Sequence, residues 1–397
     1  MPVAKKIAGF SERSSWIRQM FEEGARLSEI HGRDRVFDFS IGNPNLEPPA
    51  EFQRVIEELV RDPTPGLHGY MSNAGYPEAC EAVAEYLSQD QGVRIPGQNV
   101  VMTCGAGGAL NCIFKAVLDP GDEVVVPRPY FVEYGFYVDN HGGVLKPVAS
   151  GPDFELDIDA IEDAIGRKTR AVLINSPHNP TGRIYTEASL EAVGDLLRRK
   201  CRQYARIIYL VSDEPYRRIV YDGHRVPPVM AAYANSIIAS SYSKELSLAG
   251  ERIGYLAANP SIPGVAALME GLVLANRILG FVNAPALMQR AVARLQGVGV
   301  DVTPYRRNRD VLCEALTAAG FHVVKPEGAF YLFPRSPIED DVAFCQEMQQ
   351  HLVLVVPGSG FGLAGHFRLA YCVPPEVVDG ALPAFREVGE KYFGSQR

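Results

Sequence analysis

A single lysine, Lys244, is the residue of this sequence best placed to carry out chemistry. It follows the apolar run Ile237-Ile238-Ala239 within the segment Ser241-Tyr242-Ser243-Lys244, and Arg252 comes eight residues later. A lysine that leaves a buried strand among hydroxyls and an arginine is suited to form a Schiff base with an aldehyde cofactor that carries a phosphate. Taken alone, the stretch is explained equally well as a strand end followed by a polar loop, because short motifs also occur by chance.

Further polar and aromatic residues follow other apolar runs of the chain. Residues 104–108 are small and Gly-rich and open a helix, where backbone N–H groups can bind a phosphate, although a tight turn is an equal alternative. Phe131 could stack on a planar cofactor or pack in the core. Residues 175–182 hold two Asn and two Pro, which predicts a rigid loop with a candidate cis bond at Asn179-Pro180. Asp213 follows five apolar residues, and burying its carboxylate is costly unless a cation such as a protonated pyridine nitrogen lies nearby.

A mostly parallel sheet would bring these residues together. Short β-branched runs alternate with helix-length segments, which predicts strands at 100–103, 123–126, 171–174, 207–211 and 236–239 and helices at 76–89, 107–118, 187–204 and 263–279. Apolar runs without alternation, separated by helices, are typical of an α/β sheet covered on both faces. Ligands of such sheets bind at the carboxyl ends of the strands.

The pattern changes after about residue 283. Helices predicted at 284–295, 305–319, 339–351 and 376–392 enclose short strands predicted at 321–324, 329–333 and 367–371. This mixture indicates a second, smaller α+β domain. The loop at residues 42–49 is a candidate crossing between domains. We therefore expect an N-terminal segment at 1–48, a large domain at 49–283 and a small domain at 284–397.

Composition excludes several classes of function. The formal net charge of −8 over 397 residues argues against nucleic acid as a partner, because phosphate backbones are bound by clustered Lys and Arg. No apolar stretch of about 18 residues predicts a membrane span, and the N-terminus lacks the apolar core of a secretory signal. The seven cysteines show no zinc-like spacing, so no metal site is expected, and they indicate a reducing compartment. We expect a cytoplasmic protein.

Three motifs together make the chain resemble a known family. Asn-Pro-Thr-Gly at 179–182, Asp-x-x-Tyr at 213–216, and Ser-x-Ser-Lys at 241–244 with Arg252 resemble the class I/II aminotransferases of fold type I, which use pyridoxal 5′-phosphate (PLP). The resemblance covers nearly the whole chain. It implies a large α/β domain with a mostly parallel sheet of the seven-stranded type, covered by helices. It also implies a smaller α+β domain built from the N-terminal segment and the C-terminal third.

The resemblance also implies roles for the residues around the cofactor ring. Lys244 matches the lysine that binds PLP covalently and then carries the proton. Asp213 matches the carboxylate that keeps the ring nitrogen protonated, so that the ring accepts electrons. Asn179 and Tyr216 match the donors to the phenolic oxygen of the ring, and Phe131 matches the aromatic residue that stacks on it.

Other matches concern the phosphate, the substrate and the partner subunit. The phosphate site implied by the resemblance comprises Ala106, Gly107, Ser241, Ser243 and Arg252. Arg368 matches the arginine that binds the α-carboxylate of the substrate, and Gly42 and Asn179 are also expected to bind the substrate. Tyr70 matches a tyrosine that reaches the phosphate of the neighbouring subunit, which implies a homodimer with shared active sites.

The substrate and the outcome of the reaction are less constrained by sequence. Arg277 lies one position from where relatives specific for dicarboxylates place a second arginine, and a solvated arginine on an amphipathic helix is the alternative. The leading function is ping-pong exchange of the amino group between an L-amino acid and a 2-oxo acid. The alternatives are a PLP-dependent β-lyase, a PLP enzyme that forms carbon–carbon bonds, and a non-enzymatic regulator with this fold. His178 departs from the family pattern, and a turn-capping role is one explanation for it.

Overall fold

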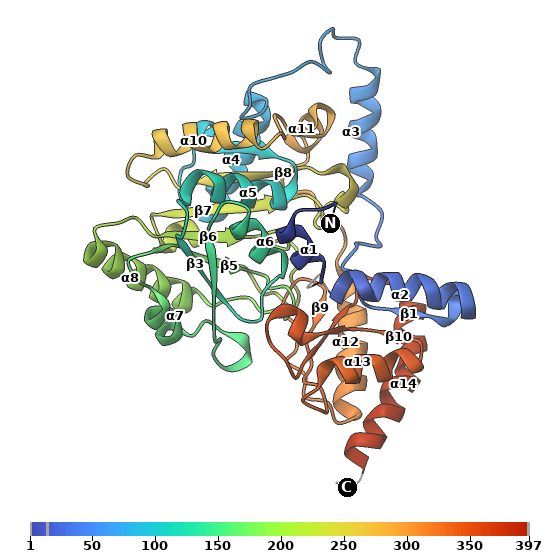
Figure 1. Ribbon diagram of the computed structural model, residues 1–397. Helices are drawn as coiled ribbons and strands as arrows, with labels where there is room; N and C mark the ends of the chain where they lie inside the picture. Colours follow the sequence, from blue (N-terminus) through green and yellow to red (C-terminus); the bar gives the residue numbers. More distant parts are fainter. Residues whose placement is uncertain (1, 13–15, 395–397) are drawn as a thin grey trace.

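The computed structural model describes residues 2–12 and 16–394 of the chain (Figure 1). Its largest sheet has seven strands among these residues, in the order β2-β8-β7-β6-β5-β3-β4. The strands are β2 (Val100–Thr103), β3 (Glu123–Pro127), β4 (Val144–Val148), β5 (Thr169–Asn175), β6 (Tyr209–Asp213), β7 (Ser236–Ser241) and β8 (Gly254–Ala258). Only β8 pairs in antiparallel fashion with its neighbours in this sheet, so the predicted mostly parallel α/β sheet is confirmed.

Helices cover both faces of this sheet because alternate strand residues point to opposite sides. In β5, Val172 and Ile174 pack in one apolar cluster, whereas Ala171 and Leu173 pack in another. The first cluster includes side chains of α4 (Pro77–Gln91), α7 (Ile158–Ala164), α8 (Glu187–Tyr204), α9 (Val229–Ala232) and α11 (Ala286–Ala293). The second includes side chains of α5 (Gly105–Val117), α6 (Glu133–Asp139) and α10 (Val265–Ile278).

A second group of elements lies below this sheet in Figure 1 and has its own aromatic core. Its strands form an antiparallel sheet in the order β11-β12-β9 and a parallel pair β1-β10. They are β1 (Phe37–Asp38), β9 (Tyr331–Leu332), β10 (Val353–Leu354), β11 (Val356–Pro357) and β12 (Phe367–Ala370). The helices are α2 (Trp16–His31), α12 (Thr303–Ala318), α13 (Asp341–Gln350) and α14 (Pro375–Phe393). Short 3₁₀ segments complete the chain at η1 (Arg33–Arg35), η2 (Gly97–Asn99), η3 (Pro152–Phe154), η4 (Ala249–Glu251) and η5 (Gly358–Phe361).

One predicted strand is wrong, and several short strands were not predicted. Residues 321–324 form no strand, because Phe321 is instead inserted among the rings of Phe344, Phe367 and Phe393. The apolar residues of this stretch therefore reflect packing and not pairing in a sheet. The strands β1, β4, β8, β10 and β11 were not predicted. All five have five residues or fewer, which leaves little periodicity to detect.

The domain boundaries expected from the sequence remain a prediction. The packing of the elements supports one proposed change to them. β1 pairs with β10, so part of the N-terminal segment lies with the C-terminal elements. In contrast, α1 (Lys5–Glu12) contacts α6 through the ring pair Phe10–Phe136 and the ion pair Lys6–Asp139. Helix α11 packs against α3 (Ala50–Arg61) and α4 beside the large sheet. We therefore propose that the large domain extends beyond residue 283 to the end of α11.

Within the described ranges, no helix is long and apolar enough to cross a membrane.

Candidate functional site

A cavity of about 290 Å³ lies at the carboxyl ends of the central strands. Its walls come from strand ends of the large sheet and the helices that follow them, from β9 and β12, and from the loop that follows β1. The cavity is lined by the predicted site residues Gly42, Ala106, Gly107, Phe131, Asn179, Asp213, Tyr216, Ser241, Ser243, Lys244, Arg252 and Arg368. All the predicted site residues except Tyr70 and Arg277 therefore meet at one place.

Lys244 lies at this cavity and forms no ion pair with a carboxylate among the residues that the structure describes. It stands three residues past the end of β7, and its Nζ donates a hydrogen bond to the carbonyl oxygen of Gly42 at 2.8 Å. Burial lowers the pKa of Lys244 to about 8, and the positive charges of Arg368 and Arg252 act in the same direction. A large share of the amine is therefore neutral near pH 8, as a nucleophile or a base must be.

Asp213 is a buried carboxylate with one unsatisfied oxygen. Oδ2 accepts a hydrogen bond from the hydroxyl of Tyr134 at 2.6 Å, whereas Oδ1 has no partner in the part of the chain that the structure describes. Burial raises the pKa of Asp213 to about 7, and the Tyr134 hydrogen bond opposes that rise. A cation placed in the cavity against Oδ1 would stabilise the charged form.

The loop that follows β5 holds Asn179 beside Asp213. Asn175 donates from Nδ2 to the backbone oxygen of Asp213 at 2.7 Å and accepts at Oδ1 from the backbone N–H of Asn179 at 2.6 Å. The predicted cis bond at Asn179-Pro180 is present, as are cis bonds at Ser176-Pro177 and Arg128-Pro129. His178 is buried away from the cavity lining and forms a 2.8 Å hydrogen bond with Thr181, and burial lowers its pKa to about 3. His178 therefore shapes the loop as a neutral residue.

Small residues and one arginine form an anion-binding corner. The helix α5 begins at Gly105, whose φ of +73° is the left-handed conformation that favours glycine. A Cβ at Gly105 would lie 3.1 Å from Nη2 of Arg252, so a small residue is needed there. Ala106 and Gly107 occupy the first turn, where free N–H groups and the helix dipole favour an anion. The serines at 241 and 243 line the same cavity.

Arg368 is buried at 2% exposure, and among the described residues it has no carboxylate partner. Its guanidinium lies between two rings, 4.8 Å from the centre of Tyr331 and 4.7 Å from that of Phe361. It donates to Oδ1 of Asn179 at 3.2 Å and to the carbonyl oxygen of Ser40, while Nε has no partner in the described structure. A buried guanidinium with a free N–H is suited to bind a carboxylate from the cavity.

Tyr216 and Phe131 complete the walls of the cavity. The Tyr216 hydroxyl lies 2.8 Å from that of Tyr331, and both side chains are buried. Phe131 packs edge-to-face on Tyr134 with the ring centres 5.6 Å apart. Its position between the end of β3 and the cavity is compatible with stacking on a planar ligand.

Two predicted residues lie away from this cavity. The Tyr70 side chain is 94% exposed, and Arg277 lies on the exposed side of α10 in a separate hollow shared with Asn73. The two regions are nonetheless neighbours, because Asn276 donates to the backbone oxygen of Asn73 at 2.9 Å.

Sequence reasoning missed several residues that line or support the cavity. Tyr134 lies three residues after Phe131 in the sequence, and a helix begins between them. This helix start is the feature of the sequence that could have placed Tyr134 beside the cavity. Asn175 was part of the predicted rigid loop, but its contact with Asp213 was not predicted. Tyr331 gave no comparable signal, because its contact with Tyr216 depends on the tertiary fold. Tyr137 also lines the cavity and lies on the same short helix as Tyr134.

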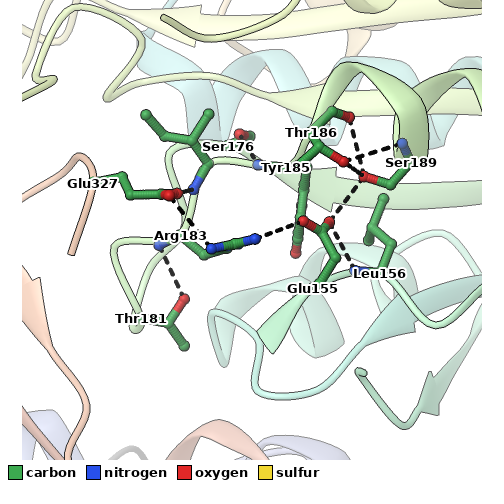
Figure 2. A network of polar contacts seen from close by, with 10 residues as sticks. Glu155, Leu156, Ser176, Thr181, Arg183, Tyr185, Thr186, Ser189 and Glu327 are labelled. Carbon is green, nitrogen blue, oxygen red and sulfur yellow. Dashed lines mark hydrogen bonds and ion pairs between the residues drawn. The ribbon is translucent and has the colours of Figure 1, made fainter. Parts of the chain in front are cut away.

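An ionic network holds the loop after Asn179 against the segment before β9 (Figure 2). Arg183 contacts Glu155 at 2.9 Å and Glu327 at 3.4 Å. Glu327 also accepts from the backbone N–H of Ile184 at 3.0 Å. Since Asn179 lies four residues before Arg183 and Tyr331 four residues after Glu327, this network connects two walls of the cavity.

Comparison with known proteins assigns the family. The model of the family described as aminotransferase class I and II matches residues 34–385. The chain belongs to this family. This aminotransferase is 35% identical over 354 residues to the aspartate/prephenate aminotransferase of Thermus thermophilus, a match that covers 87% of this chain and 89% of that relative.

Solved structures agree with the family assignment. An amino transferase from Eubacterium rectale has a TM-score of 0.96 at 40% identity, with 99% of this chain and 100% of that chain covered. The aspartate aminotransferase of T. thermophilus with maleate has a TM-score of 0.86 at 28% identity, with 98% and 100% covered. The protein is therefore a PLP-dependent aminotransferase, an enzyme that transfers an amino group between an amino acid and a 2-oxo acid.

The chemistry of the cavity fits this cofactor. The unsatisfied Oδ1 of Asp213 suits a protonated ring nitrogen, and the corner formed by α5 and Arg252 suits a phosphate. The amine of Lys244, which has no carboxylate partner in the described part of the chain, suits an aldehyde. The Nε of Arg368, which has no partner among the same residues, suits a carboxylate.

Proposed function

We propose that Lys244 is the catalytic lysine of this aminotransferase and that Arg368 binds the α-carboxylate of the amino acid. One observation carries the proposal: the amine of Lys244 shares a single cavity with Oδ1 of Asp213 and Nε of Arg368, two buried polar atoms that have no partner among the described residues. Buried polar groups without partners are costly, so their presence here supports a site built for a ligand with both a cationic and an anionic group.

The proposed division of labour follows from this arrangement. When bound, PLP supplies an aldehyde that links to amines and a ring that accepts electrons from the α-carbon. Arg368 holds the α-carboxylate of the substrate, which fixes the direction of the α-hydrogen relative to Lys244. Nζ of Lys244, whose pKa is lowered to about 8, takes the α-proton from the substrate and later gives it back, so that one side chain acts first as a base and then as an acid. Asp213 stabilises positive charge at the ring nitrogen, and Tyr216 and Asn179 donate hydrogen bonds to the phenolic oxygen.

We also propose that the enzyme works as a homodimer whose subunits share their active sites. Tyr70 is almost fully exposed in the single chain, and Leu274 and Ile278 of α10 are apolar side chains exposed by half or more on a neighbouring surface. A second copy of the chain would cover this surface. Tyr70 would then reach the phosphate in the cavity of the other subunit.

The amino donor that we propose is acidic. The lysine and arginine side chains that line the cavity are those of Lys244, Arg252 and Arg368, all with roles assigned above, so a second substrate carboxylate needs a cation from elsewhere. Arg277 is exposed on the surface assigned to the dimer and supports that role. Several relatives are named as aspartate aminotransferases, which favours aspartate or glutamate. The seven cysteines are all unpaired, which supports a cytoplasmic location.

A half-reaction with single amino acids tests the function. We expect about one equivalent of 2-oxo acid per subunit from aspartate or glutamate without an acceptor, as ping-pong transfer requires. Lys244→Ala should abolish the absorbance band of the covalently bound cofactor and reduce turnover by about 10⁴-fold, whereas Lys115→Ala, at an exposed site on α5, should change neither. Sustained release of ammonia with pyruvate would instead identify a β-lyase.

The same panel tests the acidic donor. Arg277→Ala should lower kcat/KM for aspartate and glutamate by about tenfold or more and leave neutral donors unchanged, because only acidic donors carry a second carboxylate. Equal values for all donors in both proteins would show that Arg277 is a solvated surface residue.

A further inference from the structure

Tyr331 is a buried side chain that contacts three groups of the proposed site. It lies in β9, which pairs with β12, the strand that carries Arg368. Its hydroxyl is 2.8 Å from the Tyr216 hydroxyl, and its ring lies 4.8 Å from the Arg368 guanidinium. A Cβ at Gly42 would collide with the Tyr331 hydroxyl, so the loop that accepts the Lys244 hydrogen bond is also packed against this residue.

The number of protons fixes the direction of the Tyr216–Tyr331 hydrogen bond in the loaded enzyme. A phenol has one O–H to donate and can accept through its oxygen. If Tyr216 donates to the phenolic oxygen of the cofactor, its single proton is used, and Tyr331 must be the donor between the two tyrosines. A hydrogen bond received by Tyr216 polarises its O–H and strengthens the bond that it donates. Burial raises the pKa of Tyr331 to about 12, so its proton is present at neutral pH.

The ring of Tyr331 acts on a different part of the site. It forms one side of the pair of rings that enclose Arg368, and Phe361 forms the other at 4.7 Å. The rings hold the guanidinium through cation–π attraction and leave its edge free for hydrogen bonds with a carboxylate. The hydroxyl and the ring therefore serve different partners and can be removed separately.

We propose that Tyr331 is a positioning residue with two separable functions: its hydroxyl donates to Tyr216 and so tunes the phenolic oxygen of the cofactor, and its ring aligns Arg368 for the substrate carboxylate. This inference rests on the proposed roles of Tyr216 and Arg368. It goes beyond them by assigning a role to a residue that acts through Tyr216 and Arg368.

Absorbance of the loaded enzyme against pH tests the hydroxyl. Tyr331→Phe leaves Tyr216 a weaker donor, so the phenolic oxygen holds its proton more tightly. We expect the midpoint of the titration to rise by about 0.5 pH unit. Tyr216→Phe removes the donor itself and should raise the midpoint further. Tyr305→Phe is the matched control, because Tyr305 is a fully buried tyrosine that contacts Phe330 and does not line the cavity. It should leave the midpoint unchanged.

Steady-state kinetics tests the ring. Tyr331→Phe keeps an aromatic face against Arg368, so KM for the amino donor should change less than about twofold, whereas Tyr331→Leu should raise KM by roughly tenfold. Urea unfolding of each variant shows whether a change in KM follows a change in stability. A fall in kcat/KM of the same size in both variants would contradict the separate function of the ring.

The titration distinguishes failure of this inference from failure of the proposed function. If Tyr216→Phe moves the midpoint and Tyr331→Phe does not, Tyr216 contacts the cofactor but Tyr331 does not tune it, and the inference is wrong. If neither variant moves the midpoint, the proposed contact of Tyr216 with the cofactor is wrong as well.

Discussion

Asp213 shows how a single residue is prepared for a ligand. Its carboxyl group is buried at the end of β6, where one oxygen is satisfied by Tyr134 and the other is not. Without a cation, burial raises its pKa to about 7. The cofactor-free protein therefore holds a proton on Asp213 that the unfolded chain would release at much lower pH, and this difference links stability to pH.

The pH dependence of unfolding tests this arrangement in the cofactor-free protein. A carboxyl whose pKa is higher in the folded state contributes stability below its unfolded pKa, and that contribution is lost as pH rises through about 7. The parent should therefore lose more unfolding free energy between about pH 5 and about pH 8 than Asp213→Asn does, as measured by urea unfolding. Burial also raises the pKa of Glu245 to about 7, but Glu245 is present in both proteins and cancels in the comparison. Identical losses in the two proteins would show that Asp213 is ionised without the cofactor.

At the scale of elements, the site depends on how the loop after β5 meets the segment before β9. Gly182 accepts at its carbonyl oxygen from the backbone N–H groups of Glu327 and Gly328, at 3.0 and 2.9 Å. The ion pairs of Arg183 with Glu155 and Glu327 reinforce this contact (Figure 2). Because these side chains are about one-fifth exposed, their ion pairs are less screened than those on the surface.

Removing one charge of this network tests its contribution. Glu327→Gln should lower the free energy of unfolding by about 1 kcal/mol, because Arg183 loses one of its two carboxylate partners. Glu162→Gln is the matched control, since Glu162 pairs with Arg199 and Lys200 on the surface and the change should have almost no effect. The measurement is the urea concentration at the midpoint of unfolding, provided that the dependence of the unfolding free energy on urea concentration is unchanged. Equal effects of the two substitutions would mean that the network does not stabilise the contact between the two segments.

At the scale of the whole molecule, the single chain leaves two predicted residues outside the cavity. Tyr70 and Arg277 lie on one surface that we assign to a second subunit. If sites are shared, each cavity needs Lys244 from one subunit and Tyr70 from the other.

Mixed subunits test this sharing directly. Lys244→Ala and Tyr70→Ala homodimers should both have low activity. After the two proteins are unfolded together and refolded, random pairing in a symmetric dimer should restore about a quarter of the parent's activity, because half the dimers then hold one intact site. Refolding each variant alone is the control. Failure to regain activity, with heterodimers demonstrated by a tag on one chain, would show that Tyr70 acts within its own subunit or not at all.

Local sequence was sufficient for much of the fold and for proposing site residues, most of which line one cavity. The predicted helix at 187–204 has the bounds observed for α8, and five strands of the large sheet lie where short β-branched runs predicted them. These features are readable because helix and strand periodicities act over a few residues. The types of residue at strand ends indicated the chemistry in the same way: a lysine among hydroxyls at 241–244, a carboxylate after a buried strand, and a rigid Asn-Pro loop.

Only the tertiary structure decided which of these groups lack partners and which neighbours tune them. The contact of Tyr331 with Tyr216 joins residues 115 positions apart, and that of Arg368 with Asn179 joins residues 189 apart. Such pairs leave no periodic trace along the chain, because their geometry is set by how the segments after β5 and β6 meet β9 and β12. The sequence by itself therefore indicated the cofactor and led to the proposal of Lys244 as its lysine, whereas the fold decided the protonation of Asp213, the alignment of Arg368 and the exposure of Tyr70. The physical reason is that burial and missing partners are properties of packed atoms and not of residue types.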